Sequence, residues 1–112
     1  MLTLDRFMLL QSRLHATPAA VIDFCQRWHV AELALFGSVL REDFHADSDI
    51  DVLISFDTIG DERWNLFDLI KMQQELEALF QRRVDLVEKS GLRNPYRRGE
   101  ILNTCQTIYG SE

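Results

Sequence analysis

This chain of 112 residues has only two cysteines, Cys25 and Cys105, and no Cys/His cluster with the spacing of a metal site. A zinc-binding or disulfide-rich module is therefore not indicated. Each cysteine lies far from the other within an apolar helical pattern. A disulfide between them is one interpretation, and we favour the other, buried free thiols in a reducing cytoplasm.

An excess of positive charge is also missing, since the formal net charge is −6. Direct DNA binding is not expected, because a large nucleic-acid footprint needs a basic face. A nucleotide is not excluded, because metal ions and backbone N–H groups can reach its phosphates. No apolar run approaches membrane length and the N-terminal residues do not have the pattern of a signal peptide, so we expect a cytoplasmic protein without a membrane partner.

What the sequence does contain favours one small domain over residues 1–112, with 46% apolar residues and a single core. The pattern predicts an α/β (α+β) fold, a small mixed β-sheet flanked by helices. In chain order, the predicted segments are N-terminal helices over 1–30, a strand–turn–strand over 31–56, a helix over 64–80, a third strand over 82–87 and a C-terminal helix over 94–104.

Local signals place several boundaries. The residue pairs Thr17-Pro18 and Asn94-Pro95 are typical helix starts, with a capping side chain followed by proline. A first short helix is predicted over Leu4–Leu14, and a turn or longer loop over Asp57–Asp61. For Cys105–Tyr109 two readings stay open, a last short strand or a tail packed on the core.

Aromatic residues and basic doublets receive structural interpretations. We assign the large aromatic side chains to the core rather than to base stacking: Trp28, Trp64, Phe67 and Phe80. The doublets Arg82-Arg83 and Arg97-Arg98 are interpreted mainly as solvated faces, with Arg97 or Arg98 facing an acidic partner surface as the alternative.

The stretch over residues 32–56 carries the strongest functional signal. Its first apolar run ends at Gly37-Ser38, and its second begins directly after Asp49 and Asp51. Side chains alternate along a strand, so these two carboxylates face the same way with Cα atoms roughly 6–7 Å apart. Such a pair repels itself unless a proton or cation lies between its members, which favours Mg²⁺ or Mn²⁺.

Two further features fit a phosphate-handling site. A strand that ends in Gly-Ser and enters a helical turn offers a close backbone approach, a hydroxyl and unpaired N–H groups to an anion. Asp85 lies in the third predicted strand between Val84 and Leu86, where a lone acid needs a functional reason. Three carboxylates beside a phosphate cradle indicate two-metal phosphoryl transfer.

One pattern in this stretch resembles the DNA polymerase beta-type nucleotidyltransferases. It consists of Gly37-Ser38, ten intervening residues and then Asp49-Ile50-Asp51, with Ser48 directly before the acidic pair and Asp85 in a later strand. The chain's length is similar to that of the minimal nucleotidyltransferases (MNT proteins). These are often encoded beside a HEPN-domain protein, as the antitoxin of a toxin–antitoxin pair. One departure is Glu42, where the family often has glycine.

The resemblance implies roles for individual residues. Gly37 and Ser38 would hold the β- and γ-phosphates of ATP, with Ser48 in the same phosphate-binding group. Asp49 and Asp51 would ligate two Mg²⁺ ions, with Mn²⁺ as the alternative metal.

Two more residues receive roles by the same resemblance. Asp85 would ligate the catalytic ion and help deprotonate the acceptor. Arg41 would contact phosphate or a partner, or else form a surface salt bridge.

The expected function is an antitoxin that transfers AMP from ATP to a tyrosine hydroxyl of a HEPN-domain RNase toxin, within a hetero-oligomer. Two alternatives stay open. One is a catalytically silent MNT-fold antitoxin that blocks the toxin sterically. The other is nucleotidyl transfer to a small molecule, for which related enzymes carry an additional substrate-binding region.

Overall fold

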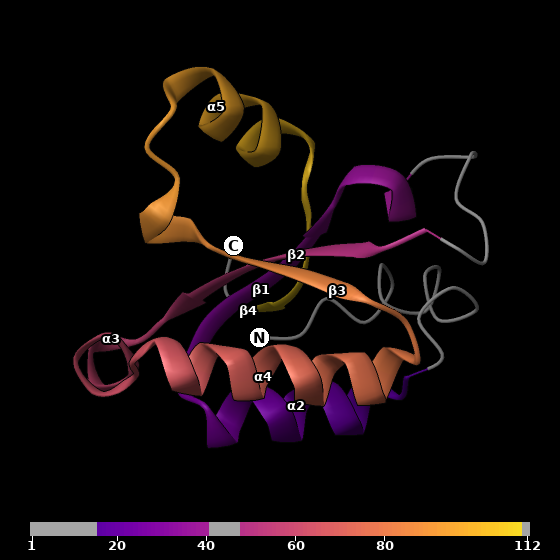
Figure 1. Ribbon diagram of the computed structural model, residues 1–112, viewed down its shortest axis with the longest axis vertical. Coiled ribbons are helices and arrows are strands. Elements are labelled where there is room, and N and C mark those ends of the chain that lie inside the picture. The colour runs from indigo at the N-terminus through magenta and orange to yellow at the C-terminus, as the bar shows by residue number, and fades with distance from the viewer. Residues whose placement is uncertain (1–15, 41–47, 111–112) are drawn as a thin grey trace.

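The computed structural model describes residues 16–40 and 48–110, which form a mixed α/β fold with helices on both faces of a sheet (Figure 1). The predicted fold class is thereby confirmed, whereas the predicted helix over Leu4–Leu14 lies outside the described residues. The elements are α2 (Pro18–Arg27), β1 (Val30–Phe36), the 3₁₀ turn η1 (Gly37–Leu40), β2 (Ile50–Phe56), α3 (Thr58–Arg63), α4 (Leu66–Phe80), β3 (Val84–Glu88), the 3₁₀ turn η2 (Lys89–Gly91), α5 (Pro95–Thr104) and β4 (Gln106–Gly110).

Capping side chains set the starts of three helices. The Thr17 hydroxyl accepts from the Ala20 N–H at 3.2 Å, and the Asn94 amide oxygen accepts from the first turn of α5, in each case just before a proline. Asn65 and Asp68 form a reciprocal capping box that starts α4. Both proline-based starts are therefore confirmed, and α4 begins two residues later than the range 64–80 predicted.

The sheet has the strand order β3-β2-β1-β4. Strands β2 and β3 run parallel, joined through α3 and α4, whereas β1 pairs antiparallel with both β2 and β4. The predicted mixed sheet is confirmed. Of the two readings for Cys105–Tyr109, the strand is correct, since β4 spans Gln106–Gly110.

The two faces of the sheet are covered differently. Helices α2 and α4 lie side by side on one face, and α5 lies on the other (Figure 1). The side chains of β1 and β2 that point toward α2 and α4 are buried with the inward faces of those helices: Leu33, Leu35, Ile50, Val52, Ile54, Phe24, Met72, Leu76 and Phe80. The α5 face has a smaller apolar cluster: Ala34, Phe36, Leu53, Leu92 and Ile101.

Residues 57–61 do not form the predicted turn or loop. They begin the short helix α3, because the Asp57 carboxylate accepts from the Gly60 N–H at 2.9 Å and so caps the helix. The assignment of Phe67 to the core is also wrong, since its side chain is 73% exposed at the start of α4.

The Trp28 and Trp64 rings meet edge to face, with centroids 4.9 Å apart. The Trp64 indole N–H donates to the Trp28 carbonyl at 2.7 Å, and the Trp28 indole N–H donates to the Glu75 carboxylate at 2.6 Å. Both rings therefore pack against the core with their N–H groups satisfied.

Both cysteines are free thiols, with Cys25 buried and Cys105 half-buried, as the favoured interpretation expected. Burial raises the pKa of the Cys25 thiol to about 12, because the apolar surroundings disfavour the thiolate. Among the helices of the described segments, none is long and apolar enough to cross a membrane.

Candidate active site

The site is built at the junction of β1, η1 and β2. Gly37 follows the last residue of β1 and has φ +76°, a conformation that residues with a Cβ rarely adopt. A Cβ at this position would collide with the Asp51 carboxylate. Glycine is required here both by the backbone angle and by the close approach of Asp51, which pairs with Phe36 in the adjacent strand.

Asp51 and Asp85 are direct neighbours in the sheet, because the parallel register of β2 and β3 pairs them. Adjacent strands lie about 4.8 Å apart, and paired residues of parallel strands point to the same face. The preceding pair, Ile50 and Val84, is buried in the core under α2 and α4. Asp51 and Asp85 therefore point to the opposite face, which is the one that α5 covers.

Hydrogen bonds fix the starts of both acidic strands. The Ile50 N–H donates to the Arg83 carbonyl at 2.9 Å, and the Arg82 guanidinium donates to the Ser48 carbonyl at 3.2 Å, directly before the exposed Asp49. The Glu77 carboxylate accepts from the Val84 N–H at 3.0 Å. Arg82 is thus partly buried and ties β2 to the α4–β3 connection, so its assignment to a solvated face is wrong.

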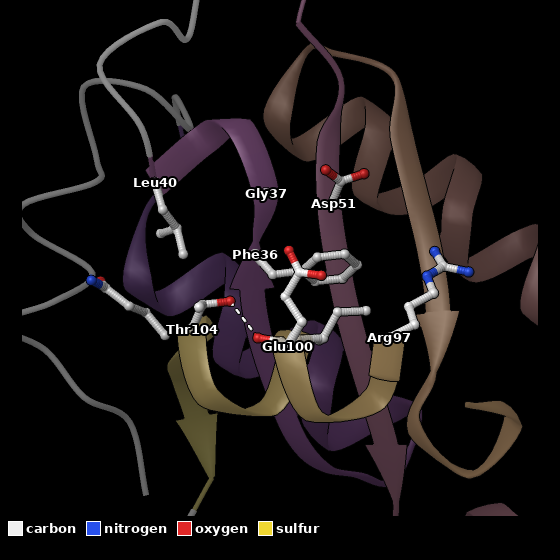
Figure 2. Close-up of a pocket in the computed structure, with 9 residues that line it drawn as sticks. Phe36, Gly37, Leu40, Asp51, Arg97, Glu100 and Thr104 are labelled. Atoms are coloured by element: carbon white, nitrogen blue, oxygen red, sulfur yellow. Dashed lines mark hydrogen bonds between the residues drawn. The ribbon is translucent and has the colours of Figure 1, made fainter. Parts of the chain in front are cut away.

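A cleft of about 640 Å³ opens beside Asp51 on this face. Its walls come from the end of β1 and η1, from β2, from α5 and from the start of β4: Phe36, Gly37, Leu40, Asp51, Arg97, Glu100, Ile101, Thr104 and Gln106. Figure 2 shows the Arg97 and Glu100 side chains reaching toward the strands from α5. Sequence reasoning missed the α5 residues, since no local signal shows which sheet face this helix covers.

The remaining predicted site residues are less fully described. Arg41 lies outside the described residues, and Ser38 contributes its backbone to η1. Ser48 is half-buried next to Asp49, with its carbonyl bound to Arg82. The structure thus brings Gly37, Asp51 and Asp85 together at one edge.

This donor set can be tested against a magnesium ion. Within residues 16–40 and 48–110, no three acidic, histidine or cysteine side chains converge to form a metal cage by themselves. Mg²⁺ seldom uses such a cage, because it is usually bound through one or two carboxylates together with waters and substrate phosphates. Acidic oxygens on neighbouring strands beside the glycine turn therefore fit Mg²⁺ that arrives with a nucleotide.

The described chain thus combines a glycine turn, neighbouring carboxylates on a mixed sheet and an open cleft. The family model for the nucleotidyltransferase domain matches residues 20–108, so the chain belongs to this family and is a nucleotidyltransferase. Within the family it is an MNT protein, as two similarities show. The protein adenylyltransferase MntA of Thermococcus cleftensis is 41% identical over 69 residues, which cover 62% of this chain and 66% of that protein. A solved minimal nucleotidyltransferase is 34% identical, with a TM-score of 0.65 over 80% of this chain and 86% of that one.

Two more distant structures share the fold. A toxin–antitoxin complex with AMP-PNP gives a TM-score of 0.68 at 19% identity, covering 86% of this chain and 75% of that one. A chain from the complex of the tri-AMPylated Shewanella oneidensis HEPN toxin with MNT antitoxin gives a TM-score of 0.59 at 18% identity. The match covers 84% of this chain and 70% of that one.

Proposed function

We propose that this chain is a cytoplasmic antitoxin that transfers AMP from ATP to a tyrosine hydroxyl of a HEPN-domain RNase toxin, within a hetero-oligomer. The observation that carries the proposal is the position of Asp51, in register with Asp85 and in close approach to Gly37, at an open cleft. The names of the similar proteins support it, since they include an adenylyltransferase and an AMPylated HEPN toxin with its MNT antitoxin.

The turn after β1 would bind the nucleotide's terminal phosphates. Gly37 lets its backbone approach a ligand closely, and η1 begins there with N–H groups that have no helical acceptor. Ser38 and Ser48 would add hydroxyl donors to the β- and γ-phosphates. The sheet edge with the acidic residues lies directly beside this turn.

Asp49, Asp51 and Asp85 would hold the Mg²⁺ ions. When bound, these ions would offset the phosphate charge and lower the cost of making the attacking oxygen and the leaving pyrophosphate anionic. Asp51 lies on the strand between Gly37 and Asp85, and in this proposal it would serve both parts of the site.

In the transfer step, the tyrosine oxygen attacks the α-phosphorus of ATP and forms the new P–O bond. The bond from that phosphorus to the bridging oxygen of the β-phosphate breaks, and pyrophosphate leaves with the bond's electron pair. The hydroxyl proton passes to the Asp85 carboxylate, which is exposed at the edge strand β3 and open to an incoming protein.

Co-expression with the protein encoded next to this chain, which the proposal expects to be a HEPN protein, tests the proposal, with the intact mass of that partner as the readout. The wild-type chain should add one or more AMP groups, and Asp49→Asn/Asp51→Asn should add none while keeping its circular dichroism spectrum. The matched control, Asp61→Asn/Glu62→Gln, removes two exposed acids of α3 and should leave the modification intact. An unmodified partner in a stable complex with the wild-type chain would instead indicate a sterically acting antitoxin.

A further inference from the structure

Arg97 lies on the wall of the cleft that α5 forms. It belongs to the first turn of α5, where its backbone N–H is capped by Asn94 at 3.2 Å, and its side chain is exposed. In the view of Figure 2, Arg97 and Gly37 are drawn to either side of Asp51, and all three line the cleft. Its side chain therefore borders the space that faces the acidic strand, on the side away from the phosphate-binding turn.

Its neighbour Arg98 has a different environment. The Arg98 guanidinium donates to the carbonyls of Lys89 and Leu92 at 3.1 and 3.4 Å, and so holds η2 against α5. Within the described segments, the Arg97 guanidinium forms no such structural bond or ion pair. Arg98 is thus a structural residue, and Arg97 is available to a ligand.

Charge makes Arg97 significant. Of the described residues that line the cleft, Asp51 and Glu100 carry negative charge and Arg97 is the one cation. A nucleotide brings further negative charge into this space, and a fixed positive group would offset part of it beside any bound metal. Arginine suits this role, because its planar guanidinium can donate two parallel hydrogen bonds to one phosphate.

We propose that Arg97 binds the α-phosphate of the nucleotide from the α5 side of the cleft. The inference rests on the proposed function, in which the turn at Gly37 takes the β- and γ-phosphates. The α-phosphate then lies next to Asp51, and Arg97 occupies the far side of that carboxylate. Contact with the α-phosphate would also place positive charge on the group that is transferred.

The test compares AMP with adenosine, since the two differ only in the α-phosphate. Binding is measured by titration calorimetry or NMR in EDTA, so that no metal contributes. We expect Arg97→Ala to weaken AMP binding about tenfold, as for one charge-assisted hydrogen bond, and to leave adenosine binding unchanged. Arg97→Lys should retain part of the AMP affinity. The matched control Arg93→Ala, an exposed arginine before α5, should bind AMP as the wild type does.

Three results would overturn the proposal. Unchanged AMP affinity in Arg97→Ala would exclude the α-phosphate contact, while continued modification of the HEPN partner would leave the proposed function standing. A parallel loss of AMP and adenosine affinity would assign Arg97 a structural role. Failure of the wild-type chain to bind AMP and Mg²⁺–AMP-PNP would refute the proposed function and this inference together.

Discussion

The two faces of the sheet are made by the same strands and have opposite characters. In β2, Ile50, Val52 and Ile54 are fully buried under α2 and α4. Of the alternate residues, which point to the α5 face, Asp51 and Ser55 are half-buried, whereas Leu53 packs in the smaller apolar cluster. A period of two along the strand lets one face hold the larger apolar core and the other carry polar groups beside a smaller apolar cluster. Stability and chemistry are therefore separable in this molecule.

The difference follows from how much helix covers each face. Helices α2 and α4 run side by side beneath one face, whereas among the described helices only α5 covers part of the other and leaves the cleft beside Asp51 (Figure 1). The acids lie at the starts of β2 and β3, and Asp51 lines the cleft. We call the face under α2 and α4 the closed face and the α5 face the open face. Substitutions on the closed face should therefore change stability, and substitutions on the open face should change nucleotide binding and transfer.

The largest effect on stability is expected from Leu76→Ala. Leu76 is fully buried on α4 in the closed face, and its truncation should lower the free energy of unfolding by about 2–5 kcal/mol. Chemical denaturation measures this change, with Leu66→Ala on the same helix as the control, since Leu66 is 69% exposed. The rate of transfer per folded molecule should be unchanged. A matching loss in that rate would break the separation between the faces.

Gly37→Ala on the α5 face is expected to have a smaller effect on stability than Leu76→Ala and, unlike it, to lower the rate of transfer. The new methyl group would displace the Asp51 carboxylate and strain a backbone with φ +76°. Transfer should fall about tenfold or more, because small displacements of catalytic groups are costly, while the loss of stability stays near 1–2 kcal/mol. Initial rates measure it, with Gly91→Ala as the control, since a Cβ there meets no atom within 4 Å. Equal rates for both variants would contradict the close packing of Gly37 and Asp51.

The smallest effect is expected at Asp57, which belongs to neither face. The pKa of the Asp57 carboxyl lies below its usual value of 3.8, mainly because the Gly60 N–H donates to it. The His29 side chain lowers this pKa further, by a smaller amount. Stability from this group is thus present above pH 3.8 and is lost as the pH falls through the lower pKa of the folded state. Asp57→Asn should melt slightly below the wild type at pH 7, and the difference should shrink in acid. Thermal melts at several pH values test this prediction, with Glu62→Gln as the control variant. A melting difference between Asp57→Asn and the wild type that does not change with pH would exclude the coupling of Asp57 protonation to stability.

Much of the fold follows from local sequence signals. The predicted strand–turn–strand over 31–56 ends at the same residue as β2, and the proline-based caps at Thr17 and Asn94 locate two helices. The short helix α3 was missed because Asp57 and Gly60 are equally typical of a turn. The capping box formed by Asn65 and Asp68 is a signal that could have placed the start of α4.

The site was less accessible to sequence reasoning because its geometry depends on tertiary contacts. Alternation along one strand indicates that Asp49 and Asp51 share a face, but the register that pairs Asp51 with Asp85 arises across the long α3–α4 connection. The position of α5 depends on packing of Ile101 and Leu92 in the smaller cluster. Arg97 and the cleft therefore emerge only from the structure.

The most direct test of the open face as the catalytic one is Mn²⁺ binding in the presence of AMP-PNP. Water proton relaxation distinguishes Mn²⁺ in the complex of protein and nucleotide from Mn²⁺ on free nucleotide. We predict a ternary complex of Mn²⁺, AMP-PNP and the wild-type chain. Asp49→Asn/Asp51→Asn should lower the Mn²⁺ affinity about a hundredfold, because it removes two carboxylate ligands. Equal Mn²⁺ affinity in the wild type and this variant would contradict the assignment of these carboxylates as metal ligands.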